Sequence, residues 1–318
     1  MNLDFMEKNR FTESPMEESP REEAFARDWE TLISRHAGAL WELLRAMFVE
    51  LNFPIGDGQS KNPELLTALR HGVLPLNPQG SWRPDAPEDI RVYLHPTPVG
   101  RLPVIECEAD SDFISLQQSL VYRCEPRPVP DARGATIIKN YNNWARINMH
   151  RGEAGEIPKN PALYQDYIVL LSHRYYSGVA SEVLGLNSGD WRQKSLVLRR
   201  EHESAHYMTQ RFYHSAKNEI HDEIIADFMG LTAAFGDYDP VKFITFLGLE
   251  NHPKYRKGGR LEIYMPADAE NFNSLCEALP LAAQNIAAYY AENARDRIKT
   301  FHTLCRTSVA DMARGNLK

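Results

Sequence analysis

The segment His202-Glu203-Ser204-Ala205-His206 combines residue types that can bind a metal ion and activate water. On an α-helix of 3.6 residues per turn, His202 and His206 lie on one face, so both imidazoles can hold a single ion. Glu203 follows the first histidine, where its carboxylate can take a proton from water at the open side of the ion. The spacing H-E-x-x-H therefore predicts a metal centre on a helix. The competing interpretation is a solvated surface helix with Arg–Glu pairs four residues apart.

A carboxylate downstream can complete a three-ligand site. Glu223 follows the motif after a stretch that contains a helix break at residues 212–218, and Asp227 comes four residues later. Ser215 or Asn218 can cap the helix that begins after this break. The first helix would supply two ligands and the second helix, after a short turn, a carboxylate ligand. Three protein ligands leave one coordination position for water, which is the arrangement of catalytic zinc.

Other residues near the motif can also donate to a metal. A metzincin has a glycine three residues after the second histidine and another histidine three further on, but this chain has Thr209 and Phe212 there. The remaining alternatives to Glu223 as third ligand are His214, His221 and Asp222.

The predicted second helix favours Glu223 over these alternatives. Glu223 shares a helix face with Asp227 and Gly230, and the small residues Gly230 and Ala234 permit close approach to the first helix. Because adjacent helical residues point about 100° apart, we expect Asp222→Ala to leave zinc affinity nearly unchanged.

The segments HESAH and DEIIADFMG together resemble the zinc metallopeptidases called gluzincins, and the second segment is similar to the N-E-x-x-S-D-x-F-G of thermolysin. The resemblance covers residues 195–236. It implies that His202, His206 and Glu223 bind Zn²⁺, that Glu203 is the general base, and that Asp227 orients a ligand histidine. The spacer to Glu223 is a little shorter than is usual in that group.

The resemblance implies hydrolysis of a peptide or protein substrate by metal-activated water. The developing oxyanion then needs a second donor, for which His252, Tyr255 and Tyr264 are the candidates. Arg256 and Arg260 are candidates for binding a substrate carboxylate. A second hypothesis is a binding or regulatory protein that keeps the fold, with or without the metal, and is catalytically silent.

Composition bounds the class of protein. The chain has 318 residues, 43% of them hydrophobic and 25% charged, as in ordinary globular proteins. Its net charge of -7 argues against nucleic acid or an acidic membrane as partner. The sequence has neither an apolar run of membrane-spanning length nor a signal-peptide core at its polar N-terminus. The scattered cysteines are expected to be reduced thiols in a cytoplasmic protein, without a bridge between the first two: Cys107, Cys124, Cys276 and Cys305.

We expect an α+β, zincin-like fold in three parts. Residues 1–21 form a disordered tail, residues 22–160 an N-terminal lobe with a helix and a small sheet, and residues 161–318 a helical catalytic lobe. The sheet is expected to be mixed or antiparallel, with four or five strands. Its edge, beside the loop 140–144, is a candidate for pairing with an extended peptide, although Trp144 is as well explained as a core residue.

The expected elements follow from hydrophobic periodicity and from turn residues. Strands are predicted at 91–94, 104–108, 119–123, 136–139 and 145–149. Helices are predicted at 22–51, 64–71, 163–184, 191–213 with Asp190 as cap, 219–234 closed by Gly236, 241–248, 268–279, and 281–314 with a break near Thr300. Residues 250–265 are expected to form a loop that bends at Gly258 and Gly259, and His71 and His95 are expected in loops.

Overall fold

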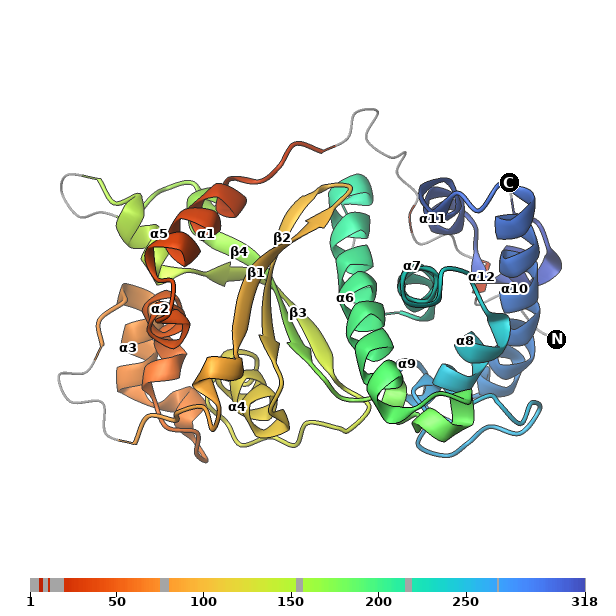
Figure 1. The fold of residues 1–318 in the computed structure, drawn as a ribbon, viewed down its shortest axis with the longest axis horizontal. Coiled ribbons are helices and arrows are strands. Elements are labelled where there is room, and N and C mark those ends of the chain that lie inside the picture. Colours follow the sequence, from red (N-terminus) through yellow and green to blue (C-terminus); the bar gives the residue numbers. More distant parts are fainter. Residues whose placement is uncertain are drawn as a thin grey trace. The chain divides into compact units, whose positions relative to one another are not determined.

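The chain is a mixed α/β protein with many helices and one small sheet (Figure 1). A computed structural model describes residues 6–7, 11, 20–74, 80–152, 157–214, 219–267 and 269–317. It divides into two units. The sheet unit comprises residues 21–130 and 135–173, and the helical unit comprises residues 1–20, 131–134 and 174–318.

The sheet has four strands in the order β1-β2-β4-β3. Its strands are β1 (Arg91–Thr97), β2 (Gly100–Cys107), β3 (Ala135–Asn142) and β4 (Gln165–Ser172). β2 and β4 are parallel, whereas β1 and β3 are antiparallel edge strands. A small sheet, either mixed or antiparallel, was predicted; the sheet is mixed, and three of its strands lie where they were predicted. Residues 140–142 belong to β3, beyond a register shift at Asn140, so the predicted loop 140–144 is wrong in its first part.

Strand β4 replaces the first part of the helix predicted at 163–184. Its residues Ile168–Leu171 are fully buried without alternation. A continuous apolar run is typical of a central strand with a parallel neighbour, because both of its faces are covered. The short run and the β-branched Ile168 and Val169 are compatible with a strand, and the pairing with β2 and β3 decides between the two interpretations.

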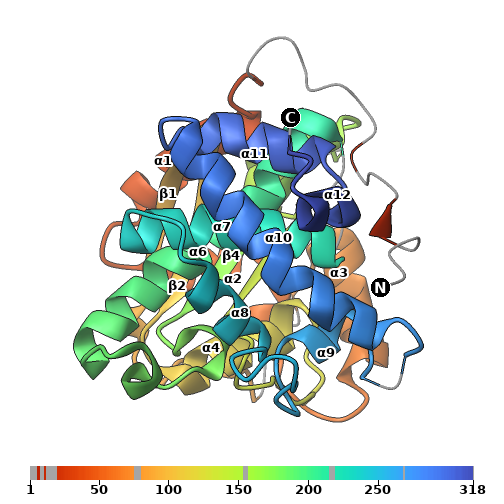
Figure 2. The same ribbon diagram turned by 90° about the vertical axis from the view of Figure 1, so that its right-hand side faces the viewer.

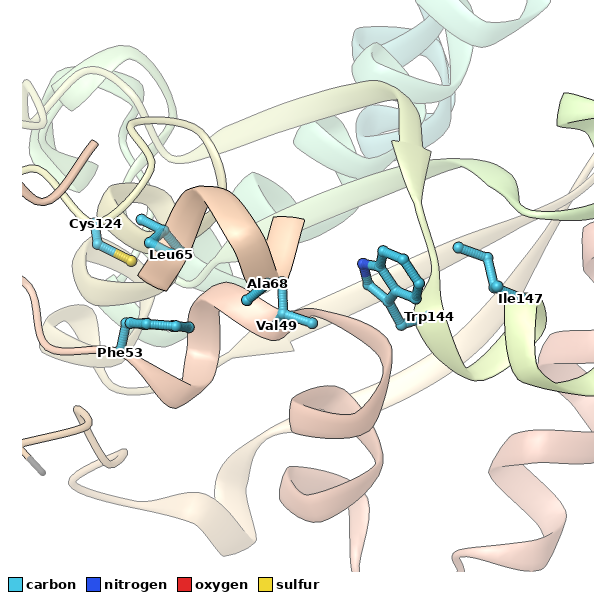
Figure 3. Packing of buried hydrophobic residues seen from close by; sticks show 7 residues of the cluster. All are labelled: Val49, Phe53, Leu65, Ala68, Cys124, Trp144 and Ile147. Atoms are coloured by element: carbon cyan, nitrogen blue, oxygen red, sulfur yellow. The ribbon is translucent and has the colours of Figure 1, made fainter. Parts of the chain in front are cut away.

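Helices flank the sheet within the sheet unit. They are α1 (Ala24–Arg35), α2 (Leu40–Met47), α3 (Pro63–His71), α4 (Asp110–Leu120) and α5 (Trp144–Met149), with short 3₁₀ segments η2 (Val49–Asn52), η3 (Gln59–Lys61), η4 (Pro87–Asp89) and η5 (Pro161–Leu163). α1 packs on β1 and β2, and α4 packs on β2 and β4. A buried cluster, shown in Figure 3, joins η2, α3 and α5: Val49, Phe53, Leu65, Ala68, Cys124, Trp144 and Ile147. Trp144 is therefore a core residue.

Three further predictions for the sheet unit are wrong. The helix predicted at 22–51 is divided into α1 and α2, because Gly38 takes a left-handed conformation with φ 87°. The strand predicted at 119–123 covers the end of α4 and the turn after it, and the buried Phe113, Leu116 and Leu120 of α4 recur at helical spacing. The strand predicted at 145–149 is α5, which begins where the Asn143 side chain accepts a hydrogen bond from the Arg146 amide at 3.1 Å.

The carboxyl group of Glu50 makes the stability of the sheet unit depend on pH. Glu50 is 2% exposed and accepts a hydrogen bond from the Tyr141 hydroxyl. Burial raises the pKa of Glu50 to about 7 from its ordinary value of 4.5. The folded state therefore favours the protonated acid, and stability that is full below pH 4.5 is lost as the pH rises through the folded pKa.

Glu50→Gln is expected to remove this loss, because the amide cannot ionise and still accepts the bond from Tyr141. The shift corresponds to at most about 3 kcal/mol between pH 4.5 and 8. Urea unfolding at both pH values measures it, with Glu42→Gln on the exposed side of α2 as control. Equal pH dependence of wild type and Glu50→Gln would contradict the role of Glu50.

The helical unit contains α6 (Ser188–Tyr213), α7 (Ile220–Phe235), α8 (Pro240–Leu247), α9 (Leu261–Tyr264), α10 (Phe272–Glu292), α11 (Arg297–Arg306) and α12 (Val309–Arg314), preceded by η6 (Tyr176–Gly178) and η7 (Ser181–Leu184). α6 packs along α7, and α10 packs against α8 and α12 (Figure 2). The helices at 219–234 and 241–248 are confirmed; Gly236 and Gly248 close them in left-handed conformations. The loop 250–265 is interrupted by the short α9.

Several finer predictions for the helices are wrong. α6 begins earlier than predicted, because Asn187 caps it and not Asp190. α10 continues through Pro280, and the C-terminal breaks fall at residues 293–296 and 307–308, not at Thr300. Asp296 and Ser308 supply the caps that fix these breaks.

The remaining predictions concern isolated residues and the N-terminus. His71 lies in α3 and His95 in β1, so neither is a loop residue. The four cysteines are free and buried, as expected. Most of the tail 1–21 lies outside the described residues, and of the described ones Met6 and Phe11 are buried. Among the described helices, none combines the length and the apolar character that crossing a membrane requires.

Candidate metal centre

Helix α6 carries both histidines of the motif on a buried face. His202, Glu203 and His206 are 6%, 9% and 4% exposed, and the two imidazole rings lie 4.9 Å apart between centroids. The surface-helix interpretation of this segment is therefore wrong. Arg199, three residues before the first histidine, is also buried and is 2% exposed.

Helix α7 carries Glu223 and Asp227 against α6. Contact between the two helices is close at Gly230, where an added Cβ would lie 2.7 Å from the Leu198 carbonyl oxygen. The absence of a side chain at Gly230 thus lets the carboxylates of α7 approach the histidines. The capping residues suggested for this helix, Ser215 and Asn218, lie outside the described residues, and Glu219 precedes its first turn.

The three predicted ligands converge. Nε2 of His202 and Nε2 of His206 lie 3.2 Å apart, and the Glu223 oxygens lie 3.3 Å from the first and 3.6 Å from the second. An ion held tetrahedrally at about 2.0–2.1 Å from each donor requires donor atoms about 3.3 Å apart. Two imidazole nitrogens and one carboxylate at these separations fit a zinc ion.

Each ligand histidine has a carboxylate behind it. His202 Nδ1 lies 2.9 Å from Asp227 Oδ1, and His206 Nδ1 lies 2.8 Å from Asp222 Oδ2. A carboxylate accepts the Nδ1 proton, so each ring can present the lone pair of Nε2 to an ion. Asp227 lies where the predicted orienting carboxylate should, whereas Asp222 has a role that the sequence analysis did not assign.

The structure corrects the expectation for Asp222. Asp222 does point away from the ion site, but toward the outer nitrogen of His206. Asp222→Ala is therefore expected to lower zinc affinity by about 10–100-fold, as does loss of an orienting partner elsewhere. Glu223→Ala should cost more, because it removes a ligand. Competition with a chelator measures both, with Asp237→Ala as an exposed control; an unchanged affinity in Asp222→Ala would refute the orienting role.

Two further residues extend the network around Asp227. Tyr176 lies with its hydroxyl 2.9 Å from His202 Nδ1 and donates to Asp227. Arg260 is 7% exposed, forms an ion pair with Asp227 and donates to the Tyr176 hydroxyl. Arg260 is thus a buried partner of the site, not an exposed loop residue. Arg256, by contrast, pairs with Glu250 at 2.5 Å near the surface.

Charges within the cluster shift several pKa values. Burial disfavours the imidazolium, but hydrogen bonds with Asp227 and Glu223 outweigh this and raise the pKa of His202 to about 10. Burial likewise opposes charging of His206, whose pKa is nevertheless raised by Asp222. Burial opposes ionisation of Glu223, yet His202 holds the pKa of Glu223 below its usual range. The carboxylates therefore favour positive charge among the three donors, carried either by protons or by a divalent cation.

Glu203 differs from the other acidic residues of the site. No described residue forms a hydrogen bond or an ion pair with its carboxylate, although the residue is only 9% exposed. It is also not among the three converging donors. A carboxylate beside a ligand and without a protein partner is suited to accept a proton from water.

The structure shows which of the candidate oxyanion donors and alternative ligands lie at the site. The Tyr264 hydroxyl donates to Glu223 Oε2 at 2.7 Å, whereas that of Tyr255 donates to the Gly259 carbonyl at 2.6 Å and His252 is exposed. Of the alternative ligands, His221 lies 2.9 Å from the Leu304 carbonyl and His214 is exposed at the end of α6.

Sequence reasoning missed the role of Asp222 behind His206, and it missed Tyr176 and the site role of Arg260. For Asp222 a signal existed, since it directly precedes the ligand Glu223 on the same helix. Tyr176 and Arg260 lie far from the motif in sequence, and no spacing rule connects either to it.

Fold and cluster define a mixed α/β protein with a buried His–His–Glu group that suits a divalent metal. The chain belongs to a family of unknown function (DUF7005), whose model matches residues 2–316. No curated protein and no solved structure matches the chain. Family membership therefore carries no activity with it, and the function has to be inferred from the side chains of the site.

Proposed function

We propose that the protein is a zinc-dependent metallopeptidase with a zincin-like fold, in which His202, His206 and Glu223 hold the ion. The observation that carries this proposal is the convergence of the three donor groups at 3.2–3.6 Å. Support also comes from Asp227 and Asp222, each hydrogen-bonded to the outer nitrogen of one histidine.

The chain's own residues divide the chemistry between them. Zinc bound at such a site is a Lewis acid that polarises the scissile carbonyl and makes water a stronger acid. Glu203 accepts the proton of the attacking water and passes it to the leaving amine. Its carboxylate has no hydrogen-bond partner among the described residues, so none of their bonds has to be broken first, which supports this role.

Tyr264 is the best candidate for the donor to the developing oxyanion. Among the three candidates from the sequence, Tyr264 alone contacts a proposed ligand. Burial raises the pKa of its hydroxyl well above 10, so Tyr264 keeps its proton at neutral pH. A neutral phenol beside the ion site can donate to negative charge as it develops on a substrate oxygen.

A catalytically silent zinc protein is the second candidate. The low exposure of all three ligands and the hydrogen bond from Tyr264 to Glu223 favour it, because a substrate must reach the ion. A peptide or protein is the proposed substrate of the active form. The free, buried cysteines are in keeping with the proposed cytoplasmic location.

Metal analysis of the purified protein together with cleavage of a broad peptide library tests the proposal. We expect about one zinc per chain and cleavage that a chelator abolishes and zinc restores. Stoichiometric zinc without cleavage of any peptide would favour the silent protein. Cleavage that persists after the zinc has been removed would refute the proposed mechanism.

A further inference from the structure

The backbone segment Arg174–Gly178 is held by the same face of α6 that carries the first ligand histidine. Ser195 Oγ accepts a hydrogen bond from the Tyr176 amide at 3.0 Å. Arg199 donates to the carbonyl oxygens of Arg174 and Tyr175, the latter at 2.6 Å. Ser195, Arg199 and His202 are spaced four and three residues apart, so all three lie on one side of the helix.

Gly134 leaves room for this arrangement. A Cβ added at Gly134 would lie 2.2 Å from Cζ of Arg199. The buried guanidinium therefore occupies space that any other residue at this position would fill. Arg174 itself donates to the Arg133 carbonyl at 3.1 Å, which fixes the segment from its other side.

The segment is also strained where it leaves Tyr176. Ser177 has a φ of 53°, a left-handed conformation that residues with a Cβ seldom adopt. Its hydroxyl is buried and has no hydrogen-bond partner among the described residues. Since no described residue bonds to this hydroxyl, the surroundings impose the conformation and not the side chain of Ser177. Strain of this kind persists where neighbouring contacts over-determine the backbone.

The segment positions the hydroxyl of Tyr176, which contacts three charged or titratable groups of the site. It donates to Asp227, accepts from Arg260 and lies 2.9 Å from His202 Nδ1. Arg260 can only donate hydrogen bonds and the Asp227 carboxylate can only accept them. The Tyr176 hydroxyl must therefore donate its single proton in the hydrogen bond to Asp227. His202 Nδ1 then faces two acceptor oxygens and must carry a proton, which leaves Nε2 as the ligand atom.

We propose that Tyr176 is a positioning residue of the metal centre: its hydroxyl locks Asp227 and the ligand tautomer of His202. The inference rests on the proposed metal site, but not on peptidase activity. The phenol is 4% exposed, and its ring packs edge-on against Phe246 at 5.1 Å between centroids. Packing thus holds the ring, and the hydroxyl makes the hydrogen bonds of the side chain.

Tyr176→Phe tests the inference, because it removes the hydroxyl and keeps the ring. We expect zinc affinity, measured by competition with a chelator, to fall by about 10-fold or more. The visible spectrum of the Co²⁺-loaded protein should change as well, since the position of His202 around the ion changes. Tyr175→Phe is the matched control: its hydroxyl has no hydrogen-bond partner among the described residues, and its carbonyl bond to Arg199 is unaffected.

A double-mutant cycle separates positioning from general stability. If Tyr176 acts through Asp227, then Tyr176→Phe should cost little further zinc affinity in an Asp227→Asn background. Thermal unfolding of each metal-free variant shows whether it is folded. Additive losses, or a Tyr176→Phe protein that binds zinc as tightly as wild type, would overturn the inference alone. A wild type that binds no zinc would overturn the metal site and the inference with it.

Discussion

Glu203→Gln is expected to fold and to retain zinc while losing about 10²–10⁴-fold in peptidase activity, the contribution of a general base. The amide keeps the size and the hydrogen-bonding reach of the carboxylate but not its basicity. Since Glu203 is not one of the converging donors, the change leaves the ion site intact. Turnover of a peptide identified with wild type, measured with zinc content, separates loss of catalysis from loss of metal.

Glu201→Gln is the matched control for this prediction. Glu201 lies two residues away on α6, is partly exposed and faces Arg297 and Arg200. The same chemical change there should leave turnover within a few-fold of wild type, because Glu201 pairs with arginines and is not one of the converging donors. If Glu203→Gln cleaves as fast as wild type, water is activated by another group and the proposed role of Glu203 is wrong.

The ligand-bearing helices were predictable because the residues that define them are close together in the sequence. His202 and His206 are one helical turn apart, and any helix through them places both on one face. Gly230 and Gly236 similarly mark a close helix contact and a helix end by their lack of a side chain. Such patterns do not depend on where the rest of the chain lies.

The network behind the ligands was not predictable for the opposite reason. Tyr176 and Arg260 reach Asp227 from segments 51 residues before it and 33 residues after it. No periodicity relates these positions to the motif. A charged residue type is also a poor guide to exposure here: Arg199 and Arg260 are both buried, because carbonyl or carboxylate oxygens accept hydrogen bonds from their guanidinium groups.

Errors in the sheet came from short apolar runs, for which helix and strand patterns compete. The run 167–171 suits a buried helix face as well as a central strand, and only the pairing with β2 and β3 decides. For residues 119–123 and 145–149 the error was the opposite one, since strands were predicted where the chain is mainly helical. There, the helical spacing is visible only when the preceding turn or the cap at Asn143 is included.

Simultaneous substitution of both ligand histidines by alanine is expected to empty the metal site. His202→Ala/His206→Ala removes two of three donors and leaves Glu223, which as a single carboxylate cannot hold zinc against a chelator. Zinc content should fall from about one ion per chain to background. The helix itself should persist, because alanine has the highest helix propensity and α6 is anchored along its length by α7.

The loss must be specific to these two positions. His71→Ala, at the exposed end of α3, should leave the zinc content at the wild-type value, since His71 lies in the other unit of the chain. Elemental analysis after dialysis against a weak chelator measures all three proteins, and circular dichroism reports their helix content. Full zinc occupancy in the double mutant would place the ion elsewhere. The proposed roles of Asp227 and Asp222 would then be wrong as well, because both residues are proposed to act on the metal through these two histidines.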